Sequence, residues 1–201
     1  FHSNRKVVDS NEKSKTVKRR ENNQSRENEL PDIKPQIIET SSQLSKLVES
    51  LIKCDHPLNP VAIDTETTNL NPFKAELIGI GFCWGEGLKD LAYIPLGHDC
   101  KNELNFADQK RQLPLIEVIK ALTPWLSSNK HPKVLQNAKY DRLVFLHNGI
   151  PLEGVIMDTL LADYICNSTT KHSLSEIAKR ELGFLPISFD QIVGKNQTFK
   201  D

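Results

Sequence analysis

The chain has 201 residues with 26 basic and 26 acidic side chains, so its formal net charge is zero. Such a length holds one sizeable domain plus a tail. Because the chain as a whole does not attract nucleic acid, any phosphate-binding site must be local. No apolar run approaches the roughly 20 residues that cross a membrane, and no signal peptide is recognisable, so we expect a cytoplasmic protein that contacts no membrane. The cysteines lack metal-binding spacing and are interpreted as reduced thiols, namely Cys54, Cys83, Cys100 and Cys166.

The first 35 residues are rich in Lys, Arg, Glu, Asn and Ser and contain hardly an aromatic residue. A segment that can bury so little apolar surface does not fold by itself, so residues 1–35 are predicted to be a disordered charged linker. The basic run at residues 18–20 is compatible with a nucleic-acid-binding arm, although the interspersed glutamates favour a solvated linker. Because the sequence begins at Phe1 and stops at Asp201 in a polar stretch, we expect a fragment of a longer protein.

Ordered structure is expected from residue 36 onward. Thr40 and Gln43 have the spacing of a capping box, which predicts the start of a helix whose apolar residues recur every three to four positions through Ile52. Three strands with short connections follow, at about residues 61–63, 76–84 and 90–95. Successive strands of this kind predict an antiparallel meander.

The second half of the chain alternates between helices and strands. Helices are predicted at about residues 115–126, 138–147, 160–165 and 174–182, and short strands at 134–136 and 155–157. Ser173 and Glu176 form a second capping-box spacing. The helix that they open is expected to bury four residues, Leu174, Ile177, Ala178 and Leu182. The complete order predicts an α/β fold, in which a mixed five-stranded sheet, a three-strand meander followed by alternating helices and strands, is flanked by helices.

Two acidic residues, Asp64 and Glu66, stand at the end of the first strand of the predicted meander. Because side chains alternate along a strand, the two carboxylates point to the same face. At about 4 Å apart and an effective dielectric near 20 they repel by roughly 4 kcal/mol, so such a pair requires a cation or keeps a proton. A triplet of this kind is common by chance, and a strand can simply end in a polar turn, so the pair needs support from elsewhere.

Support comes from Asn137 and Asp141, which lie four positions apart at the start of a predicted helix and therefore share one face. An aspartate in the first turn often does no more than complement the helix dipole. This helix, however, directly follows a predicted buried strand, and ligands of mixed α/β sheets gather at the C-terminal ends of strands. Asp64 ends the other predicted core strand, so the three acids together favour metal-assisted phosphoryl chemistry.

These motifs resemble the 3′→5′ exonuclease domain of bacterial DNA polymerase I. Residues 64–68, Asp-Thr-Glu-Thr-Thr, are similar to the first exonuclease motif of that family, and residues 137–141, Asn-Ala-Lys-Tyr-Asp, to its second motif, N-x-x-[FY]-D. Further similar segments are residues 77–84, 92–98 and 158–175. The resemblance covers residues 36–201 and implies a ribonuclease H-like fold with the two-metal chemistry of the DEDD exonucleases.

The resemblance implies that Asp64, Glu66 and Asp141 are catalytic residues that bind two Mg²⁺ or Mn²⁺ ions. One ion would activate a water molecule and the other would stabilise the departing 3′ oxygen. The implied reaction is hydrolysis of the 3′-terminal phosphodiester of single-stranded or frayed DNA, as in proofreading, with release of nucleoside 5′-monophosphates. The implied partners are a single-stranded DNA 3′ end and a polymerase domain C-terminal to this segment of the parent chain, in a monomeric protein associated with the bacterial nucleoid. Whether a 5′-nuclease domain precedes it is left open.

The same resemblance implies contacts with the substrate. The backbone of Thr67 would meet the terminal 3′-hydroxyl, Leu70 and Phe189 would stack against the last bases, and Lys171 would contact a phosphate. The other implied contacts are Gln136, Asn137, Tyr140 and His172. Simpler alternatives stay open, because Leu70 could be a core leucine, Phe189 could pack under its own loop, and Lys171 and His172 could form a solvated turn. His98 is interpreted as a loop residue and not as a ligand.

One departure from the family concerns its third motif, Y-x-x-x-D, which is not found between Phe189 and Asp201. The family's spacing would place that motif just beyond Asp201, so residues 36–201 are expected to be a C-terminally incomplete domain that is inactive, or nearly so, by itself. The full-length parent is expected to be active. Two alternatives remain, an RNA 3′→5′ exonuclease of the RNase D type and a catalytically inactive module that holds DNA for a polymerase.

Overall fold

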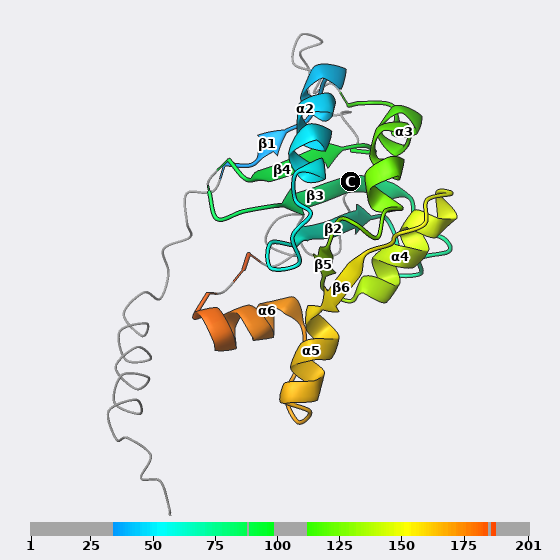
Figure 1. Ribbon diagram of the computed structural model, residues 1–201. Helices are drawn as coiled ribbons and strands as arrows, with labels where there is room; N and C mark the ends of the chain where they lie inside the picture. The colour runs from blue at the N-terminus through cyan, green and yellow to red at the C-terminus, as the bar shows by residue number, and fades with distance from the viewer. Residues whose placement is uncertain (1–33, 88, 99–111, 185, 188–201) are drawn as a thin grey trace, which may run out of the picture.

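The computed structural model describes residues 34–87, 89–98, 112–184 and 186–187 (Figure 1). Most of the predicted linker at residues 1–35, Phe189, and the stretch that ends at Asp201 lie outside the described residues. The elements are β1 (Gln36–Ile37), α2 (Ser41–Ile52), β2 (Val61–Thr67), β3 (Leu77–Cys83), β4 (Leu91–Pro95), α3 (Leu115–Leu126), β5 (Lys133–Leu135), α4 (Ala138–His147), β6 (Val155–Asp158), α5 (Thr159–Cys166), α6 (Leu174–Ile177) and the π-helical turn η1 (Ala178–Leu182).

The strands form one six-stranded sheet in the order β1-β4-β3-β2-β5-β6. The predicted α/β class and mixed sheet are confirmed, whereas the predicted number of five strands is wrong by one. The additional strand is β1, whose Gln36 and Ile37 pair in parallel with Ala92 and Tyr93 of β4. Two residues are too few to show the alternation by which a strand is recognised in a sequence, so the pattern could not reveal β1.

The centre of the sheet brings β2, which carries the first motif, beside β5, which precedes the second motif. β2, β3 and β4 pair antiparallel in succession, which confirms the predicted meander. β2 pairs in parallel with β5, and β5 with β6, so β2 and β5 end at the same edge of the sheet. The β2–β5 pairing registers Ala62 with Val134 and ends there, two residues before Asp64. The residues that follow each strand are therefore brought together.

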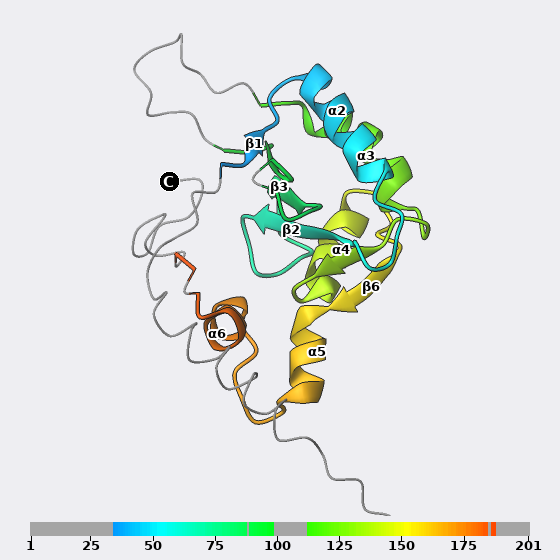
Figure 2. The same ribbon diagram turned by 60° about the vertical axis from the view of Figure 1, so that its left-hand side comes forward.

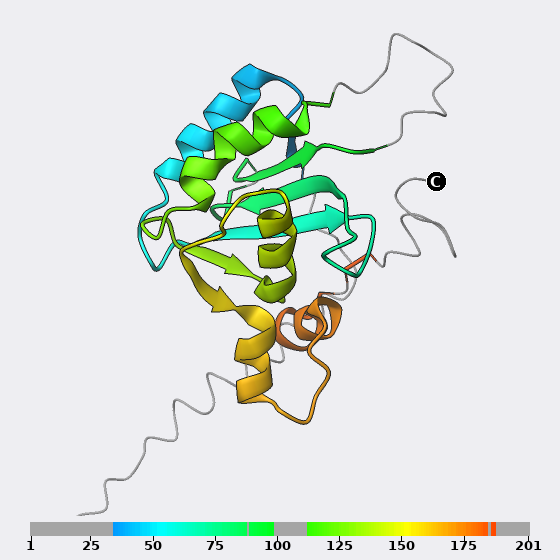
Figure 3. The same cartoon turned by 90° about the vertical axis from the view of Figure 1, so that its right-hand side faces the viewer.

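One face of the sheet is covered by α2, α3 and α4 (Figure 3). The predicted capping box at Thr40 and Gln43 is present and starts α2. Trp125 of α3 is the largest buried side chain; its ring meets Phe82 of β3 edge to face at 6.1 Å, and its Nε1 donates to the carbonyl oxygen of Leu51 at 3.0 Å. Burial of each such large apolar side chain stabilises the fold by roughly 1.5–3 kcal/mol. This packed face fixes the sheet on which the acidic residues stand.

The opposite face of the sheet contains a hollow of about 320 Å³. Its lining is mostly apolar and includes Ala62, Gly81 and Val134, with Asp64 and Gln136 as polar members. Asp64 and Ala62 belong to the set of β2 side chains that alternates with the buried Val61 and Ile63. Asp64 and Glu66 therefore lie on the face away from α2 and α3, whereas Asp141 comes from α4 and meets β2 at Thr65.

Helices α5 and α6 extend from the β6 edge of the sheet (Figure 2). The predicted N-cap is confirmed, since the Ser173 hydroxyl accepts from the Glu176 backbone N–H at 3.4 Å. The expectation that Leu174 and Leu182 are buried is wrong, because they are 56% and 71% exposed. The π-helical turn that follows α6 shifts Leu182 off the 3.6-residue period on which that expectation rested. Leu174, at the first residue of α6, instead lines the hollow on the open face of the sheet. Among the described residues no helix is long and apolar enough to cross a membrane.

Candidate active site

Asp64 and Glu66 lie on the same face of β2, as their spacing predicts, and each stands opposite a glycine of β3. The antiparallel register pairs Asp64 with Gly81 and Glu66 with Gly79. Directly opposite residues of antiparallel strands have their Cβ atoms only about 5 Å apart. Because a glycine has no Cβ, the space beside each carboxylate is open to another group.

The protein environment disfavours ionisation of both carboxylates. Partial burial raises the pKa of Asp64, against a smaller opposing effect of a hydrogen bond from the Thr65 backbone. Partial burial also raises the pKa of Glu66, and the negative charge of Asp64 adds to that increase. Two acids with raised pKa values on one face are expected where a bound cation would favour their ionised form.

Asp141, in the first turn of α4, lies against β2 beside these acids. Its side chain is 3% exposed, and its Oδ1 accepts from the Thr65 backbone N–H at 3.1 Å and from the Thr65 hydroxyl at 2.6 Å. Asp141 can reach this N–H because β5 has ended its pairing with β2 two residues before Asp64. These two bonds engage Oδ1, so Oδ2 is the oxygen that a cation could take.

Burial raises the pKa of Asp141 to about 6. The hydrogen bond from the Thr65 hydroxyl opposes this increase, whereas the nearby charge of Asp64 adds to it. Asp64 thus interacts electrostatically with both Glu66 and Asp141. The structure places Asp64 near each of the other two predicted ligands, with Glu66 on the same face of β2 and Asp141 bonded to the intervening Thr65.

The N-terminus of α4, and with it Asp141, is held by a residue that the sequence pattern did not single out as functional. The carboxylate of Asp158, at the end of β6, accepts from the backbone N–H groups of Asn137 at 3.0 Å and Ala138 at 2.9 Å. It also accepts from the Leu160 N–H at 3.0 Å and so caps α5. An aspartate before a helix is recognisable as an N-cap, but its second role across 20 residues of sequence is visible only in the fold.

The donor set fits a hard divalent cation, although the carboxylates do not form a closed cage. Among residues 34–98 and 112–187, as far as these are described, no three acidic, histidine or cysteine side chains are close enough to enclose an ion. Within the same ranges, none of the ion pairs includes Asp64, Glu66 or Asp141. Partly buried carboxylate oxygens without a cationic partner are the ligands that Mg²⁺ and Mn²⁺ prefer.

The turn after β2 presents an apolar tip beside the acids. Tyr140 of α4 ties this turn down, because its hydroxyl lies 2.5 Å from the Thr67 hydroxyl and donates to the Asn69 carbonyl at 2.5 Å. Leu70, at the tip, is 95% exposed. The alternative that Leu70 is a core leucine is therefore wrong, and Thr67, Leu70 and Tyr140 lie together at one end of the site.

Tyr93 of β4 is a further member of the site that sequence analysis missed. A Cβ on Gly79 would lie 1.8 Å from the Tyr93 hydroxyl, so the phenol occupies the space that the glycine leaves next to Glu66. The Tyr93 hydroxyl is 2.7 Å from Nε2 of His98. Burial raises the pKa of Tyr93, and the charges of Glu66 and Asp64 raise it further. Gly79 and Gly81, which alternate along β3, are a signal in the sequence from which this close approach could be inferred.

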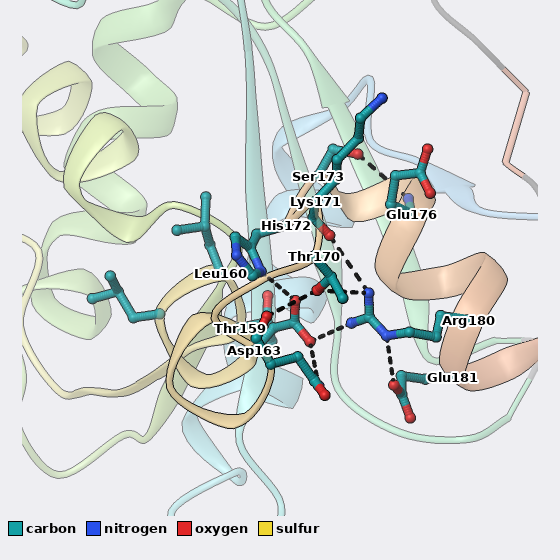
Figure 4. Close-up of polar contacts among 12 residues, drawn as sticks. Thr159, Leu160, Asp163, Thr170, Lys171, His172, Ser173, Glu176, Arg180 and Glu181 are labelled. Atoms are coloured by element: carbon teal, nitrogen blue, oxygen red, sulfur yellow. Dashed lines mark hydrogen bonds and ion pairs between the residues drawn. The ribbon is translucent and has the colours of Figure 1, made fainter.

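Two of the remaining predicted contacts, Lys171 and His172, lie at the loop between α5 and α6 (Figure 4). Lys171 is exposed, whereas Nδ1 of His172 is 2.6 Å from Asp163. Gln136 is engaged inside the protein, since its Nε2 donates to the His172 carbonyl at 2.9 Å and its Oε1 accepts from the Thr159 hydroxyl. Asn137 is exposed in a left-handed conformation with φ of 60°. Phe189 lies outside the described residues.

Comparison with known sequences identifies the family. Residues 35–200 match the family model described as 3′-5′ exonuclease. DNA polymerase I of Synechocystis sp. is 43% identical over 176 residues, which cover 86% of this chain and 17% of that protein. DNA polymerase I of Pseudomonas aeruginosa is 38% identical over 138 residues, covering 67% of this chain and 14% of that protein. The chain thus spans less than a fifth of the length of these curated relatives.

Solved structures share the fold at low sequence identity. The RNase D of Trypanosoma brucei in complex with RNA U12 has a TM-score of 0.61 at 15% identity, covering 84% of this chain and 53% of that one. The POL domain of Pol1 from M. smegmatis in complex with DNA primer-template and dNTP has a TM-score of 0.58 at 20% identity, covering 79% of this chain and 24% of that one. These likenesses confirm the ribonuclease H-like architecture. The sequence matches show that the chain belongs to the 3′-5′ exonuclease domain family of DNA polymerase I.

Proposed function

We propose that Asp64, Glu66 and Asp141 bind two Mg²⁺ or Mn²⁺ ions and that the domain hydrolyses the 3′-terminal phosphodiester of single-stranded or frayed DNA. The observation that carries this proposal is the position of Asp141, which is bonded to Thr65 between Asp64 and Glu66, with none of the three acids neutralised by a cationic side chain within the described ranges. Ions bound there would supply an activated water and would neutralise charge on the phosphate. The product is a nucleoside 5′-monophosphate.

The protein residues have separate tasks in this proposal. Asp64, Glu66 and Asp141 must be ionised to act as ligands, so protons compete with the metal. Because the pKa of Asp141 is about 6, activity should rise as the pH increases through that value. Thr65 fixes the Asp141 carboxylate through two hydrogen bonds, and Asp158 fixes the helix that carries it. The chain thus orients its acids before any ligand arrives, which lowers the cost of binding.

The substrate strand would end at the turn after β2. Leu70 projects from that turn and offers an apolar surface to the terminal bases, with the backbone of Thr67 near the 3′-hydroxyl and Tyr140 supporting both. Stacking of bases on such surfaces contributes roughly 1–3 kcal/mol per base and tolerates any sequence, as proofreading requires. Further proposed contacts are Gln136, Asn137, Lys171, His172 and Phe189.

The setting of the domain is also a proposal. Because the chain spans 17% and 14% of two DNA polymerase I relatives, we propose that its parent protein carries a polymerase domain and edits the primer strand that the polymerase extends. We propose a monomeric protein of the bacterial cytoplasm, close to the nucleoid. The polymerase relatives, at up to 43% identity, support DNA as the substrate in preference to the RNA bound by the RNase D neighbour.

The test uses the full-length gene product with Mg²⁺ and 3′-labelled single-stranded DNA or RNA. The wild-type protein is expected to release labelled mononucleotides from DNA, and Asp64→Ala or Asp141→Ala should lower the rate by at least about 100-fold, because each removes a metal ligand. Glu153→Ala, which removes an exposed carboxylate that pairs with Arg142, is the matched control and should leave the rate unchanged. Unimpaired release by Asp64→Ala, or a preference for RNA, would contradict the proposal.

A further inference from the structure

We propose that Asp163 and Arg180 form a clamp that fixes the loop at residues 167–173 and thereby presents Lys171 to a phosphate of the bound strand. This proposal rests on the proposed function, because it assigns the loop a part in holding single-stranded DNA. Asp163 and Arg180 would be positioning residues, since they act through Lys171 and do not contact the strand themselves. The clamp is drawn in Figure 4.

Asp163 gathers donors from both ends of the loop. Its carboxylate, on α5, is 9% exposed. Oδ2 is bonded to Nδ1 of His172 at 2.6 Å, while Oδ1 accepts from Arg180 Nη2 and from Asn167 Nδ2 at 3.3 Å. The hydrogen bond from His172 is the main cause of the lowered pKa of Asp163, with Asn167 and Arg180 adding to it. One ionised carboxylate thus joins α5, the loop and the π-helical turn.

Arg180 bonds the loop on the side opposite to His172. Its Nη1 donates to the Thr170 hydroxyl at 3.4 Å and, in a longer contact, to the carbonyl oxygen of Lys171 at 3.5 Å. Its Nε donates to Glu181 at 2.9 Å, which orients the guanidinium. The planar, multi-donor head of arginine suits such simultaneous contacts, which a lysine could not make. Arg180 therefore touches the backbone of the residue whose side chain is to be presented.

A third contact joins the loop to the residue that follows β5, close in sequence to the predicted metal ligand Asp141. Gln136 follows β5 directly and donates to the carbonyl oxygen of His172 at 2.9 Å. The carbonyl oxygens of two consecutive residues are thus held, that of Lys171 by Arg180 and that of His172 by Gln136. Gln136 stands one residue before Asn137, whose helix carries Asp141. The path from the clamp to the metal-ligand residues is therefore short and made of bonded groups.

These contacts leave the Lys171 side chain exposed while its backbone is fixed. A fixed lysine loses less conformational freedom when it binds a phosphate than a lysine on a mobile loop. If the bonds served only to stabilise α5 and α6, their loss would lower stability without affecting how the protein holds DNA. A purely stabilising role would leave KM unchanged, whereas presentation of Lys171 would lower KM and would do so only while Lys171 is present.

The test compares Asp163→Ala and Arg180→Gln in the full-length gene product. The matched controls are Glu153→Ala and Arg142→Gln, which break an exposed ion pair of 3.3 Å elsewhere. The first readout is amide hydrogen exchange of residues 167–173, where the Thr170 N–H donates to the Asn167 carbonyl at 3.1 Å. Exchange there should accelerate by at least about tenfold in both clamp variants and in neither control, because opening of the loop exposes its amides. Unchanged exchange overturns the clamp, whatever the activity of the protein.

The second readout is a kinetic cycle on single-stranded DNA. Asp163→Ala should raise KM by roughly 3–10-fold with kcat changed by less than about twofold, and should add less than about twofold to KM when Lys171→Ala is present, because coupled residues are not additive. The dependence of log KM on log salt should weaken by about 0.7 in Asp163→Ala and Lys171→Ala alike, as for one lost phosphate contact. Fully additive effects overturn the clamp. Absence of hydrolysis by the wild-type protein contradicts the proposed function, while the exchange result still decides whether the clamp exists.

Discussion

At the scale of single residues, burial of the Asp141 carboxylate in the candidate site lowers the stability of the folded protein at neutral pH. Its pKa is about 6 in the folded protein, compared with 3.8 for an ordinary aspartate. The folded state therefore binds more protons than the unfolded state between these values, so stability should decrease as the pH rises from about 4 to 6. At about 1.4 kcal/mol per pK unit, this group lowers the free energy of unfolding by about 3 kcal/mol above pH 7.

Asp141→Asn should relieve this cost. The asparagine Oδ1 can keep both hydrogen bonds from Thr65 but bears no charge, so the variant should be more stable than the wild type by up to about 3 kcal/mol at pH 7 and nearly equal to it at pH 4. The measurement is urea unfolding at both pH values in the presence of EDTA. An equal difference at the two pH values would show that the Asp141 carboxylate is not the titrating group.

Leu70 offers a residue-scale test of the substrate end of the site. Since it is 95% exposed, Leu70→Ala should change the free energy of unfolding by less than about 0.5 kcal/mol. Removal of its surface from the terminal bases should nevertheless lower kcat/KM on single-stranded DNA by about 5–100-fold, which corresponds to roughly 1–3 kcal/mol. Leu58→Ala, at a leucine that is exposed in the turn before β2, is the control. Equal activity of both variants would remove Leu70 from the site.

At the scale of elements, the two glycines of β3, Gly79 and Gly81, differ in the space that surrounds them. A Cβ at Gly79 would overlap the Tyr93 phenol, whereas a Cβ at Gly81 would come no closer than 3.9 Å to another atom. Gly79 therefore makes room for a ring that lies next to Glu66. Gly81 leaves the space beside Asp64 open.

This difference predicts opposite outcomes for the two alanine substitutions. Gly79→Ala should lower the free energy of unfolding by about 1–3 kcal/mol, because the rigid Tyr93 ring must move. Gly81→Ala, on the same strand and face, should lower the free energy of unfolding by less than about 1 kcal/mol or raise it slightly. Chemical denaturation of the two variants compares them directly. A larger loss in Gly81→Ala than in Gly79→Ala would contradict the described position of Tyr93.

The elements also show where sequence patterns succeed and fail. The bounds of α4, the Thr40 capping box and the strand meander follow from local spacing, and the structure confirms them. The two-residue β1 and the π-helical turn Ala178–Leu182 do not, because the first is too short to show a period and the second departs from the helical one. Local periodicity therefore predicts regular elements and misses irregular ones.

At the scale of the whole molecule, the acidic residues of the candidate site could be predicted from the sequence, but the hydrogen bonds that hold them in place could not. Asp64, Glu66 and Asp141 could be selected from spacing and from the family motifs that surround them. The hydrogen bond between Thr65 and Asp141 joins residues 76 positions apart, and the one between Asp158 and Asn137 spans 21 positions. Such contacts depend on the sheet order, which brings β2, β5 and β6 side by side. Pattern analysis of one sequence contains no information about these pairings.

Asp64 and Glu66 of β2 and Asp141 of α4 are proposed to share divalent cations. Anomalous diffraction from crystals of the full-length gene product grown with Mn²⁺ would locate these ions. Anomalous peaks are expected within about 2.5 Å of carboxylate oxygens of Asp64, Glu66 and Asp141, and one peak should be lost in Asp141→Ala. Peaks at other residues only, or unchanged peaks in that variant, would contradict the claim.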